Sequence, residues 1–564
     1  MPVINVHPDD LRKMVDKDIT NEVLKNDLFT LGLEFDGEGD DGSFNLEFAP
    51  DRLDRLSIEG IAFSLRYYYG LNRGVFVPRT NPPTWEIEVK SPVPCSRPKV
   101  TGAIVRGIKL NDSALRSIIQ LQEKLHDTIG RNRQKGSIGI HDLSLLKGIE
   151  NSDRISTIIY RPIDPSEHSF VPLGLKIKLT PEEVLEEHPT GKKYKKLLEH
   201  DETYPAFFDS VGLFSFPPII NSSRTEVTTD SRDLLIELTG SDQWTIDHML
   251  NIICYALEFR GGIIEEIVIK HQNSTVSKPD LSLETKYLTH SHIEKVLGTE
   301  FSQETILDLL ERSGLDAHFK DPGYEVIIPP YRVDVLHPLD IIDDIGRTFG
   351  FDNLKPRYPN VATIGGRSSH SNLERTARRI LVGAGFEDLL NFNLTNEINN
   401  FSKMNLDGVS DDYGNYKPVK IIEPYSEEYT IIRTWTLPSL LTVLENNTHR
   451  AYPQNLTEIG FTSYINTDRD SGAEEIYTIA AVSAHSQSSY EDAKSRLQFL
   501  CHQFNKKLHT PPTNHPSFIP GRTASIIIDG EACGVLGELH PKVLAEHGVE
   551  LPASAFDFRI KSLL

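Results

Sequence analysis

The chain has 564 residues, 38% of them apolar and 25% charged, which predicts a globular protein of about four domains and excludes a fibrous or disordered one. Its formal net charge of -22 argues against non-specific nucleic-acid binding, because contacts to phosphates need local positive charge. The four cysteines form no CxxC pair, and we find no signal peptide and no run of about 18 apolar residues, so a cytoplasmic protein without zinc ribbon, disulfides or membrane span is expected.

Residues 1–82 are predicted to form an N-terminal α+β domain. A helix is expected over 58–69, because Ser57 can cap it and Glu59 lies in its first turn. The proline-rich stretch 77–83 indicates a linker to the next domain.

A second domain is predicted over 84–272, where strands and helices are mixed. Alternating apolar residues predict strands at 100–110 and 234–238. Apolar residues at helical spacing predict helices at 113–130 and 245–260. The strand at 234–238 contains one acid, Glu237.

Two further domains are predicted, over 273–356 and 357–564. The first has the order helix, helix, strand, helix, similar to a small winged-helix unit, with elements at 291–297, 302–314 and 324–329. The second is expected to be a sheet flanked by helices, with elements that include 373–383, 437–446 and 523–529. The whole chain is therefore predicted to be an α+β multidomain protein.

Four aspartates are gathered between residues 334 and 344. Asp340, Asp343 and Asp344 share one face of a predicted helix, Asp334 precedes that helix, and the isoleucines at 341, 342 and 345 face a core. Close carboxylates repel one another unless a cation neutralises them, and Mg²⁺ binds a few carboxylates plus waters. On spacing alone, a solvated acidic face with Arg347 as an intrahelical partner is the simpler interpretation.

The segment 327–351, which contains these aspartates, resembles the B5 domain of phenylalanyl-tRNA synthetase beta subunits of the archaeal and eukaryotic type. The resemblance implies a Mg²⁺ ion shared with the alpha subunit and held by Asp334, Asp340, Asp343 and Asp344. Glu is common at position 343 in that family, so the shorter Asp343 could bind through a water. Other segments resemble the same family in chain order: 48–60 its N-terminal signature, 121–133, 137–143, 188–194 and 214–222 its B3/B4 editing domain, and 520–525 and 534–541 the end of its B6/B7 module.

The resemblance also implies a hydrolytic editing pocket in the domain predicted at 84–272. Its positions fall on Ser215, Asn221, Glu237 and Thr239. Glu237 could accept the proton of a tyrosine hydroxyl, and Thr239 projects from the same strand face. Two alternatives stay open, namely that Glu237 is a salt-bridged acid on an edge strand and that Asn221 is a turn residue.

Three other sets of residues carry weaker signals. His141 and Asp142 could form a base with its orienting partner, although a structural role is the simpler interpretation. Two basic sets are the best candidates for contacts to RNA phosphates, with a solvated face as an equally open alternative. These are Arg131, Arg133 and Lys135, and Lys192, Lys193, Lys195 and Lys196.

The segment 357–564 resembles a class II synthetase catalytic fold in which the ATP-binding pattern does not continue. Arg433, Glu458 and Arg522 lie near the corresponding strands, and the sequence contains neither a Walker A nor an HExxH motif. A degenerate copy that packs against the alpha subunit is therefore expected.

Taken together, the resemblance implies one subunit of an alpha2-beta2 heterotetramer that attaches Phe to tRNA(Phe) with ATP. The alpha subunit is expected to carry the aminoacylation site, and this chain the scaffold, the shared magnesium site and the hydrolysis of Tyr-tRNA(Phe). A free-standing, monomeric aminoacyl-tRNA deacylase is the alternative. A winged-helix protein acting on DNA is disfavoured, because the chain is acidic and the helices expected over 291–314 are not basic.

Overall fold

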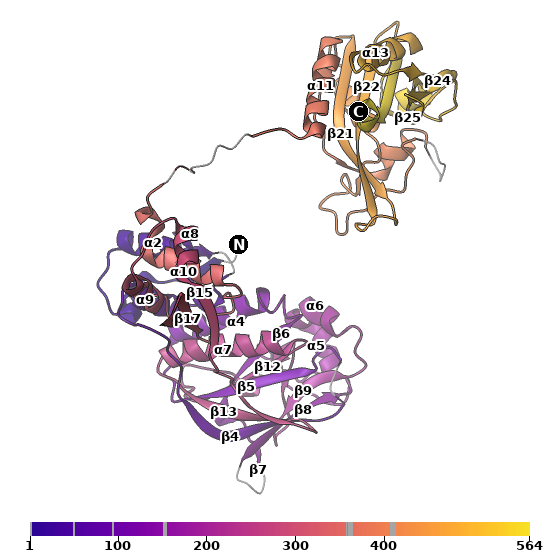
Figure 1. Cartoon of the computed structure of the whole chain (residues 1–564). Coiled ribbons are helices and arrows are strands. Elements are labelled where there is room, and N and C mark those ends of the chain that lie inside the picture. The colour runs from indigo at the N-terminus through magenta and orange to yellow at the C-terminus, as the bar shows by residue number, and fades with distance from the viewer. Residues whose placement is uncertain are drawn as a thin grey trace. The chain divides into compact units, whose positions relative to one another are not determined.

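The computed structural model describes residues 3–48, 51–92, 95–150, 155–356, 358, 365–406 and 413–564. The chain forms two compact units, Met1–Pro359 and Asn360–Leu564, and each contains its own sheets and core (Figure 1). The predicted fold class is confirmed at the level of a mixed α/β fold with several modules. The domain boundary predicted between residues 356 and 357 falls at the edge of the described ranges, because residue 357 lies outside them. In the described part of the chain, no helix combines the length and the apolar run that a bilayer crossing needs.

The first unit begins with a three-stranded antiparallel sheet in the order β1-β3-β2. Its elements are β1 (Val3–Val6), β2 (Leu33–Glu38) and β3 (Phe44–Phe48), with the helices α1 (Pro8–Val15), α2 (Asn21–Thr30) and α3 (Ile58–Tyr68). The helix predicted at 58–69 is confirmed as α3, and the Ser57 hydroxyl caps it by accepting the Gly60 N–H at 3.2 Å. The linker predicted at 77–83 is wrong from Thr80 onward, because β4 (Thr80–Val89) starts there and pairs with a parallel neighbour.

The second sheet has eleven strands in the main order β11-β10-β9-β8-β4-β13-β5-β12-β6, with β14 on β13 and β7 on β8. Besides β4 these are β5 (Lys99–Arg106), β6 (Gly136–Asp142), β7 (Ile149–Glu150), β8 (Ser156–Ile163), β9 (Tyr204–Phe208), β10 (Leu213–Phe216), β11 (Ile220–Asn221), β12 (Leu234–Gly240), β13 (Ile263–Lys270) and β14 (Thr275–Lys278). The associated helices are α4 (Asp112–Asp127), α5 (Pro181–Glu187), α6 (Pro189–Tyr194) and α7 (Gln243–Phe259). The predicted strands at 100–110 and 234–238 and helices at 113–130 and 245–260 correspond to β5, β12, α4 and α7.

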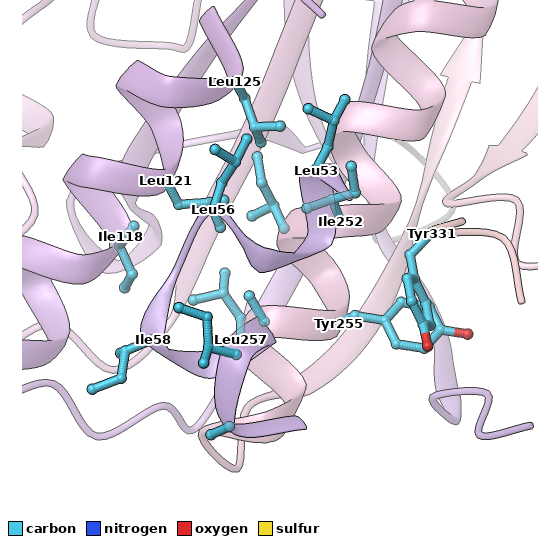
Figure 2. Close-up of a cluster of buried hydrophobic side chains, with 14 of the residues drawn as sticks. Leu53, Leu56, Ile58, Ile118, Leu121, Leu125, Ile252, Tyr255, Leu257 and Tyr331 are labelled. Atoms are coloured by element: carbon cyan, nitrogen blue, oxygen red, sulfur yellow. The ribbon is translucent and has the colours of Figure 1, made fainter. Parts of the chain in front are cut away.

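Alternation along β12 sends its side chains to two different cores. Leu234, Ile236 and Leu238 pack in the cluster that contains α4 and α7, whereas Leu235 packs in a second cluster on the opposite face. Because successive side chains of a strand alternate, Glu237 and Thr239 share the face of Leu235. Figure 2 shows the first cluster, where Leu53, Leu56 and Ile58 lie beside Leu121 and Leu125 of α4 and Ile252 and Leu257 of α7. The N-terminal segment and α7 are therefore parts of one core.

The last part of the first unit is a three-stranded antiparallel sheet with three helices. Its elements are β15 (Glu284–Thr289), β16 (Asp316–Lys320), β17 (Gly323–Ile328), α8 (His290–Leu297), α9 (Gln303–Glu311) and α10 (Pro338–Phe349). The helices predicted at 291–297 and 302–314 and the strand at 324–329 correspond to α8, α9 and β17. Ile341, Ile342 and Ile345 of α10 are buried in the core of this module, as the sequence pattern predicted.

The second unit is a seven-stranded sheet in the order β18-β21-β22-β26-β25-β24-β23, covered by helices on both faces. Its strands are β18 (Glu387–Asp388), β21 (Gln454–Ile465), β22 (Ala473–Ala484), β23 (Leu508–His509), β24 (Phe518–Ile528), β25 (Glu531–Leu539) and β26 (Ala553–Arg559), and a separate pair is formed by β19 (Leu394–Thr395) and β20 (Ile431–Ile432). Along β22, Ile479 and Ala481 pack against α11 (Ser369–Gly383) and α13 (Tyr490–Gln503), whereas Ala480 and Val482 pack against α12 (Leu437–Asn446) and α14 (Pro541–Glu546). The prediction of a sheet flanked by helices is confirmed for this segment.

Candidate functional site

Glu237 lies buried in the middle of β12, between β5 and β6, and its cross-strand neighbours are Gly102 and Gly139. Two glycines beside one carboxylate leave its flanks without side chains. A Cβ on Gly139 would collide with Glu237 Oε1 and stand 3.0 Å from His141 Nε2. The alternative of an edge-strand acid is therefore wrong, because both edges of β12 are paired.

Ser215 and Glu237 are joined by a hydrogen bond in which the Ser215 hydroxyl donates to Glu237 Oε1 at 2.7 Å. Ser215 belongs to β10 and Glu237 to β12, and these strands stand next to opposite ends of the strand order. Asn221 pairs with Ser215 across β10 and β11, and its Nδ2 reaches the Ile140 carbonyl of β6 at 3.4 Å. The sheet therefore curls until its two ends meet, and this closure brings Ser215, Asn221 and Glu237 together.

Thr239 shares the strand face of Glu237 but has a partner of its own. Its hydroxyl lies 3.1 Å from the Ser137 hydroxyl on β6, directly opposite in the strand register. The prediction that Thr239 projects from the same strand face as Glu237 is thus confirmed. Asn221 lies in β11, so the alternative of a turn residue is wrong.

His141 is buried on β6 beside Glu237. Its Nδ1 lies 2.8 Å from the Thr225 hydroxyl, and its Nε2 lies 3.7 Å from Glu237 Oε1. Asp142 does not orient this ring, because its carboxylate accepts hydrogen bonds from Ser144 and Ser231. Of the two interpretations, the base-and-orienter pair of His141 and Asp142 is therefore wrong, and Thr225 supplies the ring contact in its place.

Several buried polar atoms of this cluster have no hydrogen-bond partner within the described residues. They are Glu237 Oε2, His141 Nε2, and Nε and Nη1 of Arg97. Arg97 is 1% exposed, and burial lowers the pKa of its guanidinium to about 10. A buried polar group without a partner costs about 1–3 kcal/mol, so these atoms mark a place where a ligand or water completes the bonding. Sequence reasoning missed Arg97, Ser137, Gly139 and Thr225, which become recognisable only when the strands are paired.

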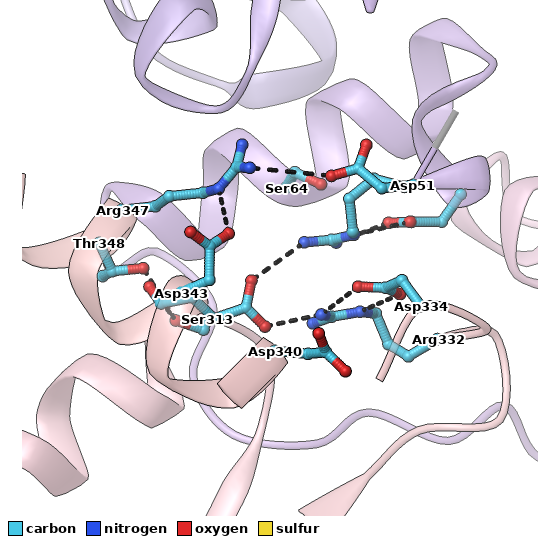
Figure 3. Close-up of polar contacts among 12 residues, drawn as sticks. Asp51, Ser64, Ser313, Arg332, Asp334, Asp340, Asp343, Arg347 and Thr348 are labelled. Atoms are coloured by element: carbon cyan, nitrogen blue, oxygen red, sulfur yellow. Dashed lines mark hydrogen bonds and ion pairs between the residues drawn. The ribbon is translucent and has the colours of Figure 1, made fainter. Parts of the chain in front are cut away.

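Of the four aspartates of the second candidate site, Asp334 precedes α10 and the other three lie within it. Figure 3 shows Asp334 bonded to Arg332 and Asp343 bonded to Arg347. The Arg332 guanidinium donates to Asp334 at 2.8 and 2.6 Å and to Asp344 at 2.6 Å. Arg52, from the N-terminal segment, lies 3.6 Å from Asp344. Burial opposes ionisation of Asp334, but the guanidinium of Arg332 holds its pKa below the usual value. Arg332 was not among the residues that the sequence singled out.

The other two aspartates are also engaged. Asp340 Oδ2 accepts the backbone N–H groups of Leu336 and His337 at 2.9 and 2.6 Å and closes a capping box at the N-terminus of α10. Asp343 accepts a bond from Arg347 Nε at 2.6 Å, the intrahelical pair that the sequence offered as the simpler interpretation.

These carboxylates do not present a ready ligand set for a divalent cation. Three of the four are paired with guanidinium groups, and the described residues contain no group of three acids, histidines or cysteines arranged to hold a metal. In this arrangement the arginines supply the neutralising charge that the family resemblance assigns to Mg²⁺. The magnesium site stays a prediction.

In the second unit, the arginines and acid singled out from the sequence pair with one another or with neighbours. Arg433 and Glu458 form an ion pair at 2.7 Å, and their side chains are 1% and 0% exposed. Arg522 pairs with Glu538 at 2.5 Å on the surface. Because the Arg433 side chain is buried and bonded to Glu458, its guanidinium is not accessible to a nucleotide phosphate.

Comparison with known proteins gives consistent matches along the chain. A family described as "Phenylalanyl tRNA synthetase beta chain CLM domain" matches residues 354–560, and one described as "tRNA synthetase B5 domain" matches residues 287–351. The chain is 55% identical to the phenylalanine–tRNA ligase beta subunit of Natronomonas pharaonis, with 100% of both chains covered. It is 34% identical to that of Archaeoglobus fulgidus, with 100% of this chain and 98% of the relative covered. The crystal structure of an N-terminal fragment of the phenylalanyl-tRNA synthetase beta subunit from Pyrococcus horikoshii is similar with a TM-score of 0.58 and 30% identity, over 62% of this chain and 99% of the fragment.

Proposed function

The chain belongs to the family of phenylalanine–tRNA ligase beta subunits, and from this membership we propose how it divides the work with an alpha subunit. The two form a cytoplasmic alpha2-beta2 heterotetramer that attaches Phe to tRNA(Phe) with ATP. The alpha subunit carries the aminoacylation site. This chain provides the scaffold and hydrolyses Tyr-tRNA(Phe) in the B3/B4 part of its first unit.

A second, hydrolytic site is useful because Phe and Tyr differ by one hydroxyl. An apolar activation pocket cannot strongly reject an isostere that merely adds a hydroxyl, whereas a site with a buried acceptor can select for that hydroxyl. The observation that carries the proposal is the state of Glu237. Ser215 fixes Oε1 at 2.7 Å, and Oε2 is buried without a partner in the described structure. A tyrosine phenol can donate to Oε2, and a phenylalanine ring cannot.

The remaining groups suit an ester hydrolysis. Water attacks the ester carbonyl, the bond from that carbon to the ribose oxygen breaks, and the ribose oxygen takes a proton. His141 Nε2 and Asn221 are the side chains near Glu237 that can position this water, because His141 is held by Thr225 through its other nitrogen. Thr239 and Ser137 continue the polar face of the pocket along β12 and β6.

The second unit fits the role of a degenerate class II module that docks on the alpha subunit. The buried ion pair of Arg433 and Glu458 supports this role, because an arginine that is bonded internally cannot bind the phosphates of ATP. ATP therefore belongs to the assembled complex as a substrate and not to this unit.

A Mg²⁺ ion on Asp334, Asp340, Asp343 and Asp344 is proposed only for the assembled complex. In the structure Arg332 and Arg347 occupy three of these carboxylates, so the ion requires that the partner subunit draws the arginines away. No catalytic step of this chain depends on that ion.

The test is co-purification with an alpha subunit, followed by Tyr-tRNA(Phe) hydrolysis by wild type and Glu237→Ala. We expect a stable complex whose wild-type form releases tyrosine and whose variant keeps aminoacylation but loses release. A monomer with hydrolase activity would favour the free-standing deacylase. Unchanged hydrolysis by the variant would remove Glu237 from the pocket.

A further inference from the structure

Two short basic segments stand out in a chain whose net charge is -22. One is the turn after α4, with Arg131 and Lys135, and the other is α6 with the following turn of 3-10 helix (Lys195–Leu198), with Lys192, Lys193, Lys195 and Lys196. All six side chains are exposed. We call these six residues the basic rim.

The structure brings the two segments together at Tyr194. The guanidinium of Arg133 lies 4.4 Å from the centre of the Tyr194 ring, and Lys193 Nζ lies 4.8 Å from it. The turn that presents Arg131 is held in an unusual shape, because Arg131, Asn132 and Arg133 all have positive φ, at 51°, 51° and 65°. Such backbone is costly for residues other than glycine, so the contacts of Arg133 must hold it.

Arg133 also links the basic rim to the strands around Glu237. Arg133 Nη1 donates to the carbonyls of Pro218 and Ile219 at 3.1 and 3.0 Å, directly before the strand that carries Asn221. The carbonyl of Arg133 accepts a bond from the buried Arg97. Gly136, which opens β6, follows Lys135 in the chain and pairs with Gly240 at the end of β12. The basic rim therefore lies beside the ends of the strands that carry Asn221 and Glu237.

We propose that the basic rim binds the backbone phosphates of the single-stranded 3′ end of a tRNA while its aminoacyl ester lies against Glu237. This inference rests on the proposed function. The rim is complementary in charge to a tRNA: it places six positive side chains on an acidic protein, beside a site whose substrate is attached to a polyanion. Five of them carry the proposal, because Lys195 is paired with Glu186 of α5 at 3.2 Å. Phosphate contacts made by Lys and Arg position a nucleic acid without reading its sequence, which suits a strand end that must reach one fixed point.

The test compares a rim variant, Arg131→Gln/Lys192→Gln/Lys196→Gln, with a control of equal charge loss, Lys109→Gln/Lys286→Gln/Lys295→Gln, whose residues lie outside both segments. Both are made in the full-length chain in complex with its partner subunit. We expect the rim variant to lower kcat/KM for Tyr-tRNA(Phe) hydrolysis at least about tenfold and to reduce the salt slope of log(kcat/KM) by about 2, since each lost contact to a single strand removes roughly 0.7. The control should match wild type.

A second substrate separates this inference from the proposed function. Adenosine esterified with tyrosine has no phosphate, so the rim variant should hydrolyse it at the wild-type rate. If the rim variant loses the same fraction of its hydrolysis rate on both substrates, or loses none on either, the proposed role of the basic rim is overturned. If the wild-type complex hydrolyses neither substrate, the editing proposal fails, and the rim is then decided by fluorescence anisotropy with a labelled acceptor-stem minihelix ending in CCA. Weaker minihelix binding by the rim variant alone supports the rim. Unchanged minihelix binding by the rim variant overturns the proposal. If the rim variant instead fails to co-purify with the partner subunit, the basic rim is a protein-binding surface and the proposal is also overturned.

Discussion

The Ser215 hydroxyl donates to Glu237 Oε1 at 2.7 Å, although the two residues lie on β10 and β12, next to opposite ends of the strand order of one sheet. This bond forms only because the sheet closes on itself. It uses one oxygen of a buried carboxylate, and the other oxygen has no hydrogen-bond partner within the described residues.

Replacement of Ser215 by alanine should slow Tyr-tRNA(Phe) hydrolysis by roughly 10- to 100-fold, because a hydrogen bond to a charged group contributes about 1.5–3 kcal/mol. Without this donor, the carboxylate loses its fixed orientation. Aminoacylation by the complex should not change, and it serves as the internal control. Normal hydrolysis by Ser215→Ala would show that Glu237 needs no such support.

Gly139→Ala should displace the carboxylate of Glu237. The added Cβ would meet Glu237 Oε1, so either the carboxylate turns away or the strand shifts. We expect Tyr-tRNA(Phe) hydrolysis to fall at least about tenfold, which corresponds to about 1.4 kcal/mol, while the complex still assembles. Gly383→Ala is the matched control, because nothing lies within 4 Å of a Cβ at that position. Equal activity of the two variants would contradict the role of Gly139.

Arg332 should be needed for the stability of the isolated chain. Arg332→Met leaves Asp334 and Asp344 without their shared guanidinium, and loss of one partner of a buried ion pair costs about 3–5 kcal/mol. Thermal unfolding should show this loss. Wild type should keep its melting temperature when Mg²⁺ is chelated, because arginine neutralises the carboxylates. A lower melting temperature of the isolated wild-type chain in chelator would instead show that the ion is already bound.

The second unit should become less stable as the pH rises towards neutrality. Burial raises the pKa of Asp557 from 3.8 to about 7, although the N–H groups of Thr436 and Leu437 and the Tyr413 hydroxyl all donate to it. Between about pH 4 and 7 the folded state therefore keeps a proton that the unfolded chain has released. Protons bound to the folded state in excess make the free energy of unfolding fall as the pH rises, and the decline ends above the folded pKa.

Urea unfolding of wild type and Asp557→Asn across this pH range measures the effect. The difference in the free energy of unfolding should change between about pH 4 and 7 and stay constant above it. A constant difference over the whole range would mean that the three donors keep Asp557 ionised in the folded protein.

The sequence predicts the elements of this chain better than the contacts between them. The apolar spacing in α7 and the alternation in β12 are local patterns, so both elements were found. The closure that joins Ser215 to Glu237 depends on strands that are remote along the chain, and no local pattern shows it. The same holds for Gly139, which looks like any glycine until the strand register places it opposite Glu237.

In the acidic cluster, the sequence pattern missed a contact between residues that are close along the chain. Spacing identified Asp340, Asp343 and Asp344 as neighbours, but it gave no weight to Arg332, which stands close by in the sequence and pairs with two of the four carboxylates. The linker predicted at 77–83 is wrong because the pairing partner of this segment lies far away in the sequence. Its prolines suggested irregular chain, whereas β4 pairs there with β13 on one side of the large sheet.

We propose that Glu237 recognises the hydroxyl that distinguishes tyrosine from phenylalanine. The most direct measurement is the ratio of hydrolysis rates for Tyr-tRNA(Phe) and Phe-tRNA(Phe), in wild type and in Glu237→Ala. We expect a strong preference for Tyr-tRNA(Phe) in wild type, because a buried acceptor selects its hydroxyl partner by several orders of magnitude, roughly 10⁴-fold in the best cases. In the variant this preference should disappear, because the hydrolysis rate for Tyr-tRNA(Phe) falls. A variant that retains the wild-type ratio would show that Glu237 does not recognise the hydroxyl.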